Sequence, residues 1–240
     1  MKTQKLQTLN IELKEQPHVC VHCGKKFMKP KTLVSHMCES KRRAMQKDEK
    51  RVQVGFMIFN RFCQIAQNSK KPQLYEDFCK SPFYNAFVKF GSFVNNVKPL
   101  YPEKFIDYVI KSGVKLDHWC RDELYEKYLY EMLKTEPVES AVQRTLQVMI
   151  EWGDNNKAPF EHYFKYVNTN RAVHDILEGK ITPWLILNCK TGKSMLASFN
   201  DEQLDLIAPA LDLPYWTRKF KECPADVVLV REICSEANIE

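Results

Sequence analysis

The stretch that most constrains the fold runs from Cys20 to His36 and reads Cys-x2-Cys-x3-Phe-x5-Leu-x2-His. Two thiolates on a tight turn, with an imidazole from a following helix, are ligands that suit a tetrahedral zinc ion. A bound metal would also replace the hydrophobic core that so short a segment cannot build. Phe27 and Leu33 would form a small apolar plug between a hairpin and that helix.

These residues resemble the C2H2-type zinc finger through the first three ligands and both apolar positions, over about a tenth of the chain. The resemblance implies a small ββα module that holds zinc. The fourth ligand departs from the family pattern. Residues 40 to 42, where that pattern has a second His or Cys, are Ser, Lys and Arg.

The nearest candidate for the fourth ligand is Cys38, two residues after His36. Residues i and i+2 of an α-helix point to nearly opposite sides, so these two can share a metal only if the helix ends or unwinds between them. A degenerate finger or a coincidental cysteine pair is the alternative. We predict a zinc site with four ligands: Cys20, Cys23, His36 and Cys38.

Positive charge is concentrated around this motif. Residues 1–51 hold 13 Lys and Arg against 5 Asp and Glu, whereas the remainder holds 23 against 25. A basic patch confined to one module is typical of a nucleic-acid contact, because neutralising phosphates releases counterions. A solvated run of charges is the alternative explanation.

If His36 is the seventh helical position of a finger, the positions that touch bases in DNA-binding fingers fall at Lys29, Thr32 and Ser35. Lys31 lies beside them, and Lys41, Arg42 and Arg43 follow in the next segment. A single finger covers about three base pairs. We therefore expect it to anchor the protein to DNA or RNA without selecting a site, or to bind a protein surface instead.

The rest of the chain predicts a mostly α-helical protein. Hydrophobic residues make up 44% of the 240 residues and aromatic residues 12%, which is enough for a core. One helix is expected over 39–67, basic in its first half and apolar in its second. An aromatic stripe over 83–97 has helical spacing and is expected in the core. Further helices are predicted at 73–80, 82–97, 102–111, 118–135, 138–152, 159–167, 172–178, 181–187, 201–208, 211–221 and 225–237.

The domain prediction has three parts: a flexible lead over 1–16, the finger and the start of the basic helix over 17–48, and an all-helical domain over 49–240. No run of 18 apolar residues occurs, and the N-terminus lacks an apolar signal core. These features predict a cytoplasmic protein with no membrane partner. The six cysteines outside the motif are expected to be reduced core residues.

Three features outside the motif could indicate catalysis or anion binding. The segment 191–194, Thr-Gly-Lys-Ser, looks like the end of a phosphate-binding loop, but Leu187 stands where that motif needs glycine. The polar turn at Asn168 could cap a helix or bind an anion. His118, His162 and His174 each have acidic neighbours, and a metal-dependent nuclease built from such groups is a further alternative.

The order of an N-terminal finger, a basic helix and an all-helical body resembles uncharacterised proteins of large tailed bacteriophages, which implies a host-cytoplasm setting. No catalytic motif was found, so we predict a binding protein and not an enzyme. The predicted function is a zinc-binding accessory factor that contacts nucleic acid in replication, recombination or transcription. A protein–protein adapter, with a polymerase or a virion component as its partner, is the alternative.

Overall fold

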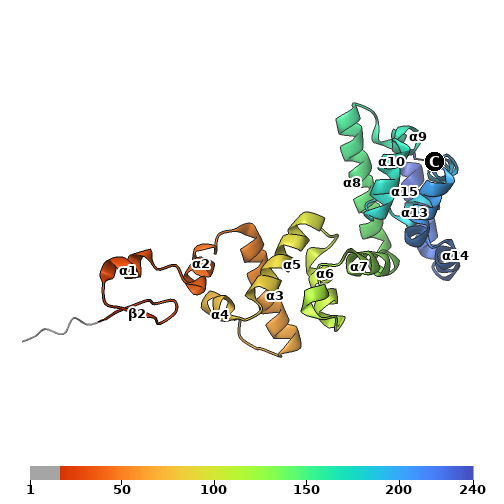
Figure 1. Cartoon of the computed structure of the whole chain (residues 1–240). Coiled ribbons are helices and arrows are strands. Elements are labelled where there is room, and N and C mark those ends of the chain that lie inside the picture. Colours follow the sequence, from red (N-terminus) through yellow and green to blue (C-terminus); the bar gives the residue numbers. More distant parts are fainter. Residues whose placement is uncertain (1–16, 240) are drawn as a thin grey trace, which may run out of the picture. The chain divides into compact units, whose positions relative to one another are not determined.

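The computed structural model describes residues 17–239 (Figure 1). Contacts divide the chain into two compact units, one formed by Met1–Lys98 and Ile110–Cys120 and the other by Pro99–Val109 and Arg121–Glu240. The predicted flexible lead, 1–16, lies outside the described residues. The domain boundary expected near residue 48 concerns only the edge of the finger and stays a prediction.

The first unit begins with a two-stranded hairpin and continues as helices, which confirms the predicted fold class. Its elements are β1 His18–Val19, β2 Lys26–Phe27, α1 Pro30–Ser35, α2 Glu39–Met45, α3 Lys50–Ala66, α4 Tyr75–Lys80, α5 Tyr84–Val97 and the 3-10 turn η1 Leu116–His118. Helix α6, Pro102–Lys111, contributes residues to both units.

Helices α3 and α5 lie side by side and form the centre of the first unit (Figure 1). Their backbones meet at two glycines: a Cβ on Gly91 would lie 2.5 Å from the carbonyl oxygen of Arg51, and one on Gly55 would lie 3.0 Å from that of Phe87. Only hydrogen atoms fit at this crossing. Phe87 and Phe90 of the aromatic stripe are almost inaccessible here, which confirms the predicted core position for the middle of the stripe. Phe83, at its start, is instead 56% exposed.

The prediction of a single helix over 39–67 is wrong. The chain forms two helices there, α2 and α3, and turns between them. Helix α2 is held on α4 by Arg43, whose Nη1 donates to the carbonyl oxygens of Cys79 at 2.8 Å and Ser81 at 3.2 Å. The Tyr75 hydroxyl donates to the Arg43 carbonyl at 2.7 Å, and the guanidinium lies over the ring of Tyr84. These contacts direct α2 away from the line of α3.

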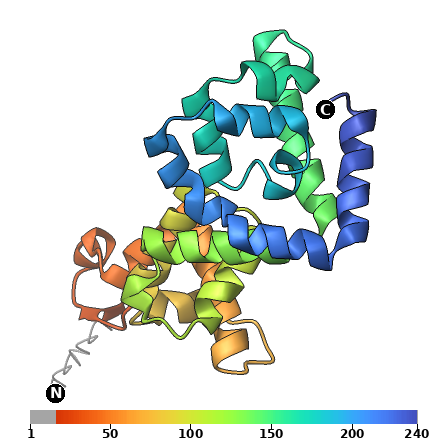
Figure 2. The ribbon, with the colours of Figure 1, turned by 90° about the vertical axis from the view of Figure 1, so that its right-hand side faces the viewer.

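The second unit contains, besides its part of α6, α7 Asp122–Thr135, α8 Val138–Asn156, η2 Phe160–His162, α9 Tyr163–Tyr166, α10 Thr169–Leu177, α11 Pro183–Ile186, α12 Lys190–Ala197, α13 Asp201–Leu211, α14 Leu213–Glu222 and α15 Pro224–Glu236. Helix α15, dark blue in Figure 2, packs on α8 and α11. Trp184 and Trp216 meet edge to face inside this core. The buried carboxylate of Glu136 is paired with both terminal nitrogens of Arg144, at 2.5 and 2.6 Å.

Most predicted helices exist, with ends that move by a few residues. Helix α6 has the predicted bounds, and α8 runs four residues further than expected, to Asn156. The segment 191–194, which lacks the first glycine of a phosphate-binding loop, lies inside α12. Thr191 and Gly192 are buried there and cannot cradle a phosphate.

Candidate metal centre

The hairpin presents the first two ligands from one tight turn. The two strands pair His18 with Phe27 and Val19 with Lys26, so Cys20 and Cys23 fall in the connection between them. The N–H of Gly24 donates to the Cys20 carbonyl oxygen at 2.8 Å. Gly24 has a φ of 73°, a backbone conformation that glycine adopts more readily than residues with a side chain. The turn brings both thiols to the same side.

The helix that precedes the third candidate ligand, His36, is short, as the spacing requires. Pro30 occupies its first turn, as expected for a residue without an N–H, and it ends at Ser35. His36 follows in an extended conformation, with φ −67° and ψ 121°. The chain therefore unwinds between His36 and Cys38, which is the condition for the two side chains to reach one point. Cys38 then caps α2, its Sγ accepting from the N–H of Lys41 at 3.4 Å.

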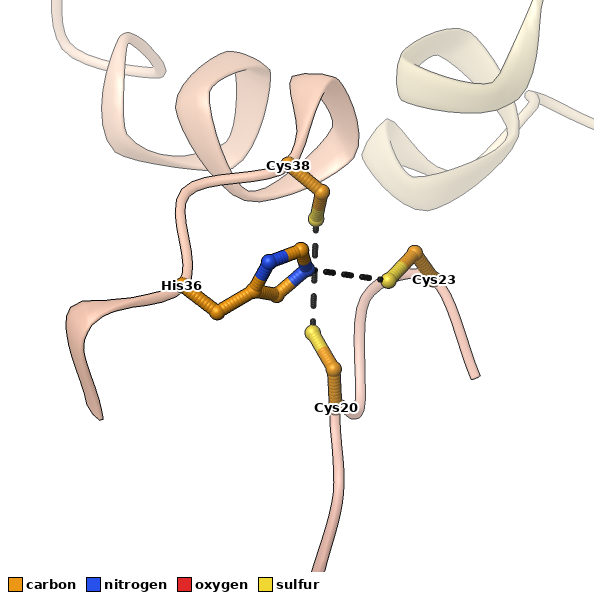
Figure 3. Close-up of side chains that lie close together, drawn as sticks. All are labelled: Cys20, Cys23, His36 and Cys38. Atoms are coloured by element: carbon orange, nitrogen blue, oxygen red, sulfur yellow. Dashed lines mark hydrogen bonds between the residues drawn. The ribbon is translucent and has the colours of Figure 1, made fainter. Parts of the chain in front are cut away.

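The four predicted ligands converge (Figure 3): their ligand atoms all lie within 4.8 Å of one another. The Sγ atoms of Cys20 and Cys38 are 4.0 Å apart, and Cys23 Sγ is 3.3 Å from His36 Nε2. With Zn–S bonds of about 2.3 Å and Zn–N bonds of about 2.1 Å, a tetrahedron places its ligand atoms about 3.6 to 3.8 Å apart. The cluster therefore has the size and the donor set of a tetrahedral metal site.

Backbone N–H groups point at both thiols of the turn. A hydrogen bond from the N–H of His22 is the main cause of the lowered pKa of Cys20. The N–H of Lys25 also acts to lower the pKa of Cys23, but desolvation and the thiols of Cys20 and Cys38 outweigh it, so that pKa is raised. Cys20 and Cys23 are close enough that two thiolates there would repel each other unless a cation lay between them.

The finger, residues 17–38, has almost no core of its own. Cys20 is its one buried residue among those described, and the expected plug of Phe27 and Leu33 is only half-buried. The Phe27 ring packs against the imidazole of His36, with centroids 4.8 Å apart. The Lys41 ammonium donates to the carbonyl oxygens of Val34 and His36, closing the segment after α1.

The seven basic and polar residues predicted to contact nucleic acid fall into two groups. Lys29, Lys31, Thr32, Ser35 and Arg42 have exposed side chains. The Ser35 hydroxyl donates to the carbonyl oxygen of Thr32, at 3.3 Å. Lys41 and Arg43 are instead engaged in the intramolecular contacts described above. Lys25 and Lys26, exposed on the hairpin, extend the basic surface beyond the predicted set.

Several apolar side chains of the finger are exposed, which the sequence analysis did not predict. Val21 is 92% exposed, Val34 77% and Met28 64%, although all three are large hydrophobic residues. Their position in the motif could have signalled this, because none occupies a ligand or plug position and so few residues cannot bury them. Met37 is also exposed beside the metal cluster.

Outside the finger, the turn at Asn168 caps α10. The side-chain oxygen of Asn168 accepts from the N–H groups of Asn170 and Arg171, which occupies the donors that an anion would need. Elsewhere in residues 17–239, no three side chains of His, Cys, Asp or Glu converge as the finger ligands do. The cysteines outside the finger are not in disulfides; Cys63, Cys79, Cys189 and Cys234 are buried and Cys120 and Cys223 half-buried.

Comparison of the chain with protein-family models, curated proteins and solved structures returned no match. The interpretation of the site as finger-like therefore rests on its geometry alone. The resemblance to bacteriophage proteins has no support beyond the order of the segments. Among the helices of residues 17–239, none combines the length and apolar character that crossing a membrane requires.

Proposed function

We propose that the chain holds one zinc ion through Cys20, Cys23, His36 and Cys38 and contacts nucleic acid through the basic surface around that site. The convergence of three thiols and one imidazole at tetrahedral spacing supports the metal. Thiolate ligands favour zinc over magnesium or calcium, which prefer oxygen donors. The zinc is structural, because all four positions are protein ligands and none is left open for a substrate.

The nucleic-acid contact is supported by the exposure of basic side chains on both sides of the metal cluster. Lys25 and Lys26 extend from the hairpin, Lys29 and Lys31 from the start of α1, and Arg42 from α2. Such side chains bind phosphates without reading sequence. The protein is accordingly an accessory binding factor in replication, recombination or transcription, and not an enzyme.

Metal analysis tests the zinc site. The purified chain is expected to contain one zinc per chain, and Cys38→Ser should retain far less after dialysis against a mild chelator. Cys120→Ser, which changes a half-buried thiol outside the cluster, is the matched control and should keep its zinc. A full, tightly held complement in Cys38→Ser would show that the fourth ligand lies elsewhere.

Fluorescence anisotropy with random duplex and single-stranded DNA and RNA tests the contact. Affinity should fall steeply between about 50 and 200 mM salt, because each phosphate contact releases counterions. Replacing Lys25, Lys29 and Lys31 with Gln should reduce the salt slope by about one per lost contact. The matched control replaces Lys165, Lys193 and Lys221, which are equally exposed in the second unit and remove the same charge. Equal losses in both variants would contradict a contact through the finger.

The adapter remains a second candidate because four apolar side chains of the finger are exposed: Val21, Met28, Val34 and Met37. Exposed apolar groups on a small module are typical of protein contacts. In the anisotropy experiment, no binding to any nucleic acid even at low salt would favour this function. The zinc analysis would be unaffected by that outcome, since both functions need the folded finger.

A further inference from the structure

Two buried thiols meet at the start of α12 in the second unit. Cys189 is the residue that precedes α12, and Cys234 lies on α15; each is 2% exposed. The two thiols lie within hydrogen-bonding reach of each other and line the same small cavity. Cysteines 45 positions apart in the sequence are thus in direct contact.

The sulfur of Cys189 lies among groups that favour its thiolate. The N–H of Gly192 donates to it at 3.2 Å from the first turn of α12. A Cβ on Gly192 would lie 2.9 Å from this sulfur, so glycine leaves the space that the sulfur occupies. The Thr191 hydroxyl has one proton, which it donates to the Ile239 carbonyl oxygen at 2.5 Å. It therefore does not donate to the Cys189 sulfur, which lies 3.7 Å away. The remaining donors are the Gly192 N–H and the Cys234 thiol.

These contacts change the acidity of Cys189. The hydrogen bond from Cys234 is the main cause of the lowered pKa of Cys189, and the N–H of Gly192 acts in the same direction, in spite of the burial of the thiol. The isolated buried thiols behave oppositely, since desolvation raises the pKa of Cys63 and of Cys79. A thiolate is the reactive form of cysteine, so Cys189 differs in reactivity from the other buried cysteines.

A small cavity reaches the pair. Its volume is about 150 Å³, and it is lined by Asn188, Cys189, Lys190, Arg231 and Cys234. The volume suits a molecule the size of hydrogen peroxide and is too small for a tripeptide disulfide such as oxidised glutathione. Lys190 and Arg231 bring two positive charges to its wall, which favours negative charge on sulfur and on a departing hydroxide.

We propose that Cys189 and Cys234 form an oxidisable dithiol that reacts with hydrogen peroxide to give an intramolecular disulfide. The Cys189 thiolate attacks one peroxide oxygen; an S–O bond forms, the O–O bond breaks, and hydroxide leaves and takes a proton to become water. Cys189 is then a sulfenic acid. Cys234, having lost its proton, attacks that sulfur; the S–S bond forms, the S–O bond breaks and a second water leaves. Two thiols are oxidised and one peroxide is reduced.

The disulfide can be identified by mass spectrometry of the full-length protein after peroxide treatment and alkylation of remaining thiols. Trypsin places Cys189 in the peptide 181–190 and Cys234 in 232–240, so the linked pair has a defined mass. Cys63, in the separate peptide 62–70, is the internal control. We expect the linked pair to form at least about tenfold faster than Cys63 is oxidised, and dithiothreitol to reverse it. Oxidation of finger cysteines appears in other peptides and is scored separately.

Two variants separate the roles of the thiols. Cys234→Ser, which keeps a hydroxyl that can donate to the Cys189 sulfur, should leave Cys189 as a sulfenic acid that a dimedone probe labels, because no thiol remains to attack it. Cys189→Ala should abolish the linked pair and leave Cys234 unlabelled. Circular dichroism checks that each variant folds. If neither does, the comparison within the unmodified protein still decides. Failure to form the linked pair, or oxidation of Cys63 at the same rate, would overturn the proposal.

Discussion

Within the finger, Cys20 alone among the residues 17–38 is buried, whereas Ile58 in α3 and Phe90 in α5 have no accessible surface. Both segments belong to the first unit. The crossing of α3 and α5 depends on close backbone contact and an aromatic core, which need no ligand. The finger has, where a core would be, four clustered side chains that could hold a metal ion. The comparison teaches that two parts of one unit can depend on different interactions for their order.

The two parts are joined through α2. The lysines of the finger are exposed, but Arg43 contacts two backbone carbonyls and the ring of Tyr84. Helix α2 therefore has its own anchor on α4, independent of the metal. The basic segment that follows the finger is therefore held in place from Arg43 onward.

The largest effect is expected from removing the metal. Structural zinc contributes about 10 to 16 kcal/mol to the folding of isolated finger peptides. Chelation, or Cys20→Ala with Cys23→Ala, should unfold residues 17–38, abolish nucleic-acid binding and leave α3 and α5 folded. Hydrogen exchange measured by mass spectrometry reports each segment separately. Loss of protection in α3 on chelation would show that the metal also supports the helical core.

The next largest effect is expected at the helix crossing. Gly91→Ala should destabilise the first unit by about 3 kcal/mol, because the new Cβ would lie 2.5 Å from the Arg51 carbonyl oxygen. The better helix propensity of alanine offsets only about 1 kcal/mol of this. Urea unfolding monitored by circular dichroism gives the change, with the exposed Asn96→Ala on the same helix as the control. Zinc content should not change, and a loss of zinc would break the proposed independence.

Arg43→Ala should have a smaller effect, of about 2 kcal/mol, since it removes the Arg43 donor from the Cys79 carbonyl oxygen and leaves the Ser81 carbonyl oxygen with the Tyr84 N–H alone. Its neighbour Arg42 is exposed, and Arg42→Ala is the matched control for stability. The order should reverse for nucleic acid, where only Arg42→Ala is expected to weaken binding directly. Equal stability of the two variants in urea would contradict the anchor.

The smallest effect is expected from pH in the second unit. The Lys134 ammonium, 2.5 Å from Asp212, is the main cause of the lowered pKa of that carboxyl. A lowered pKa adds stability above the unfolded-state value, and this stability is lost as pH falls through the folded-state value. The pair is about one-third exposed, so the contribution should stay below about 1 kcal/mol. Lys134→Met should reduce the change in melting temperature with pH between the folded-state and unfolded-state pKa of Asp212. The same pH dependence of melting temperature in the variant and the unmodified protein would contradict the pairing.

The spacing of residues 20–38 was enough to predict that four candidate ligands cluster and that the helix is broken before Cys38. This was possible because ligand chemistry and helix geometry act over a few neighbouring residues. Helical periodicity likewise predicted the buried aromatic stripe of α5. These are local properties, and they can be read without knowing what lies opposite.

Tertiary structure alone decided the features that depend on distant partners. The chain bends after α2 because Arg43 meets carbonyl groups 36 and 38 positions away, and no local pattern reveals such a contact. The same holds for Cys189 and Cys234, which appeared as two separate core residues in the sequence. Their proximity depends on packing between segments. So does the difference between the basic side chains near the finger that are exposed and those that make intramolecular contacts. Packing is set by shape and exclusion over the whole unit, which a one-dimensional pattern does not contain.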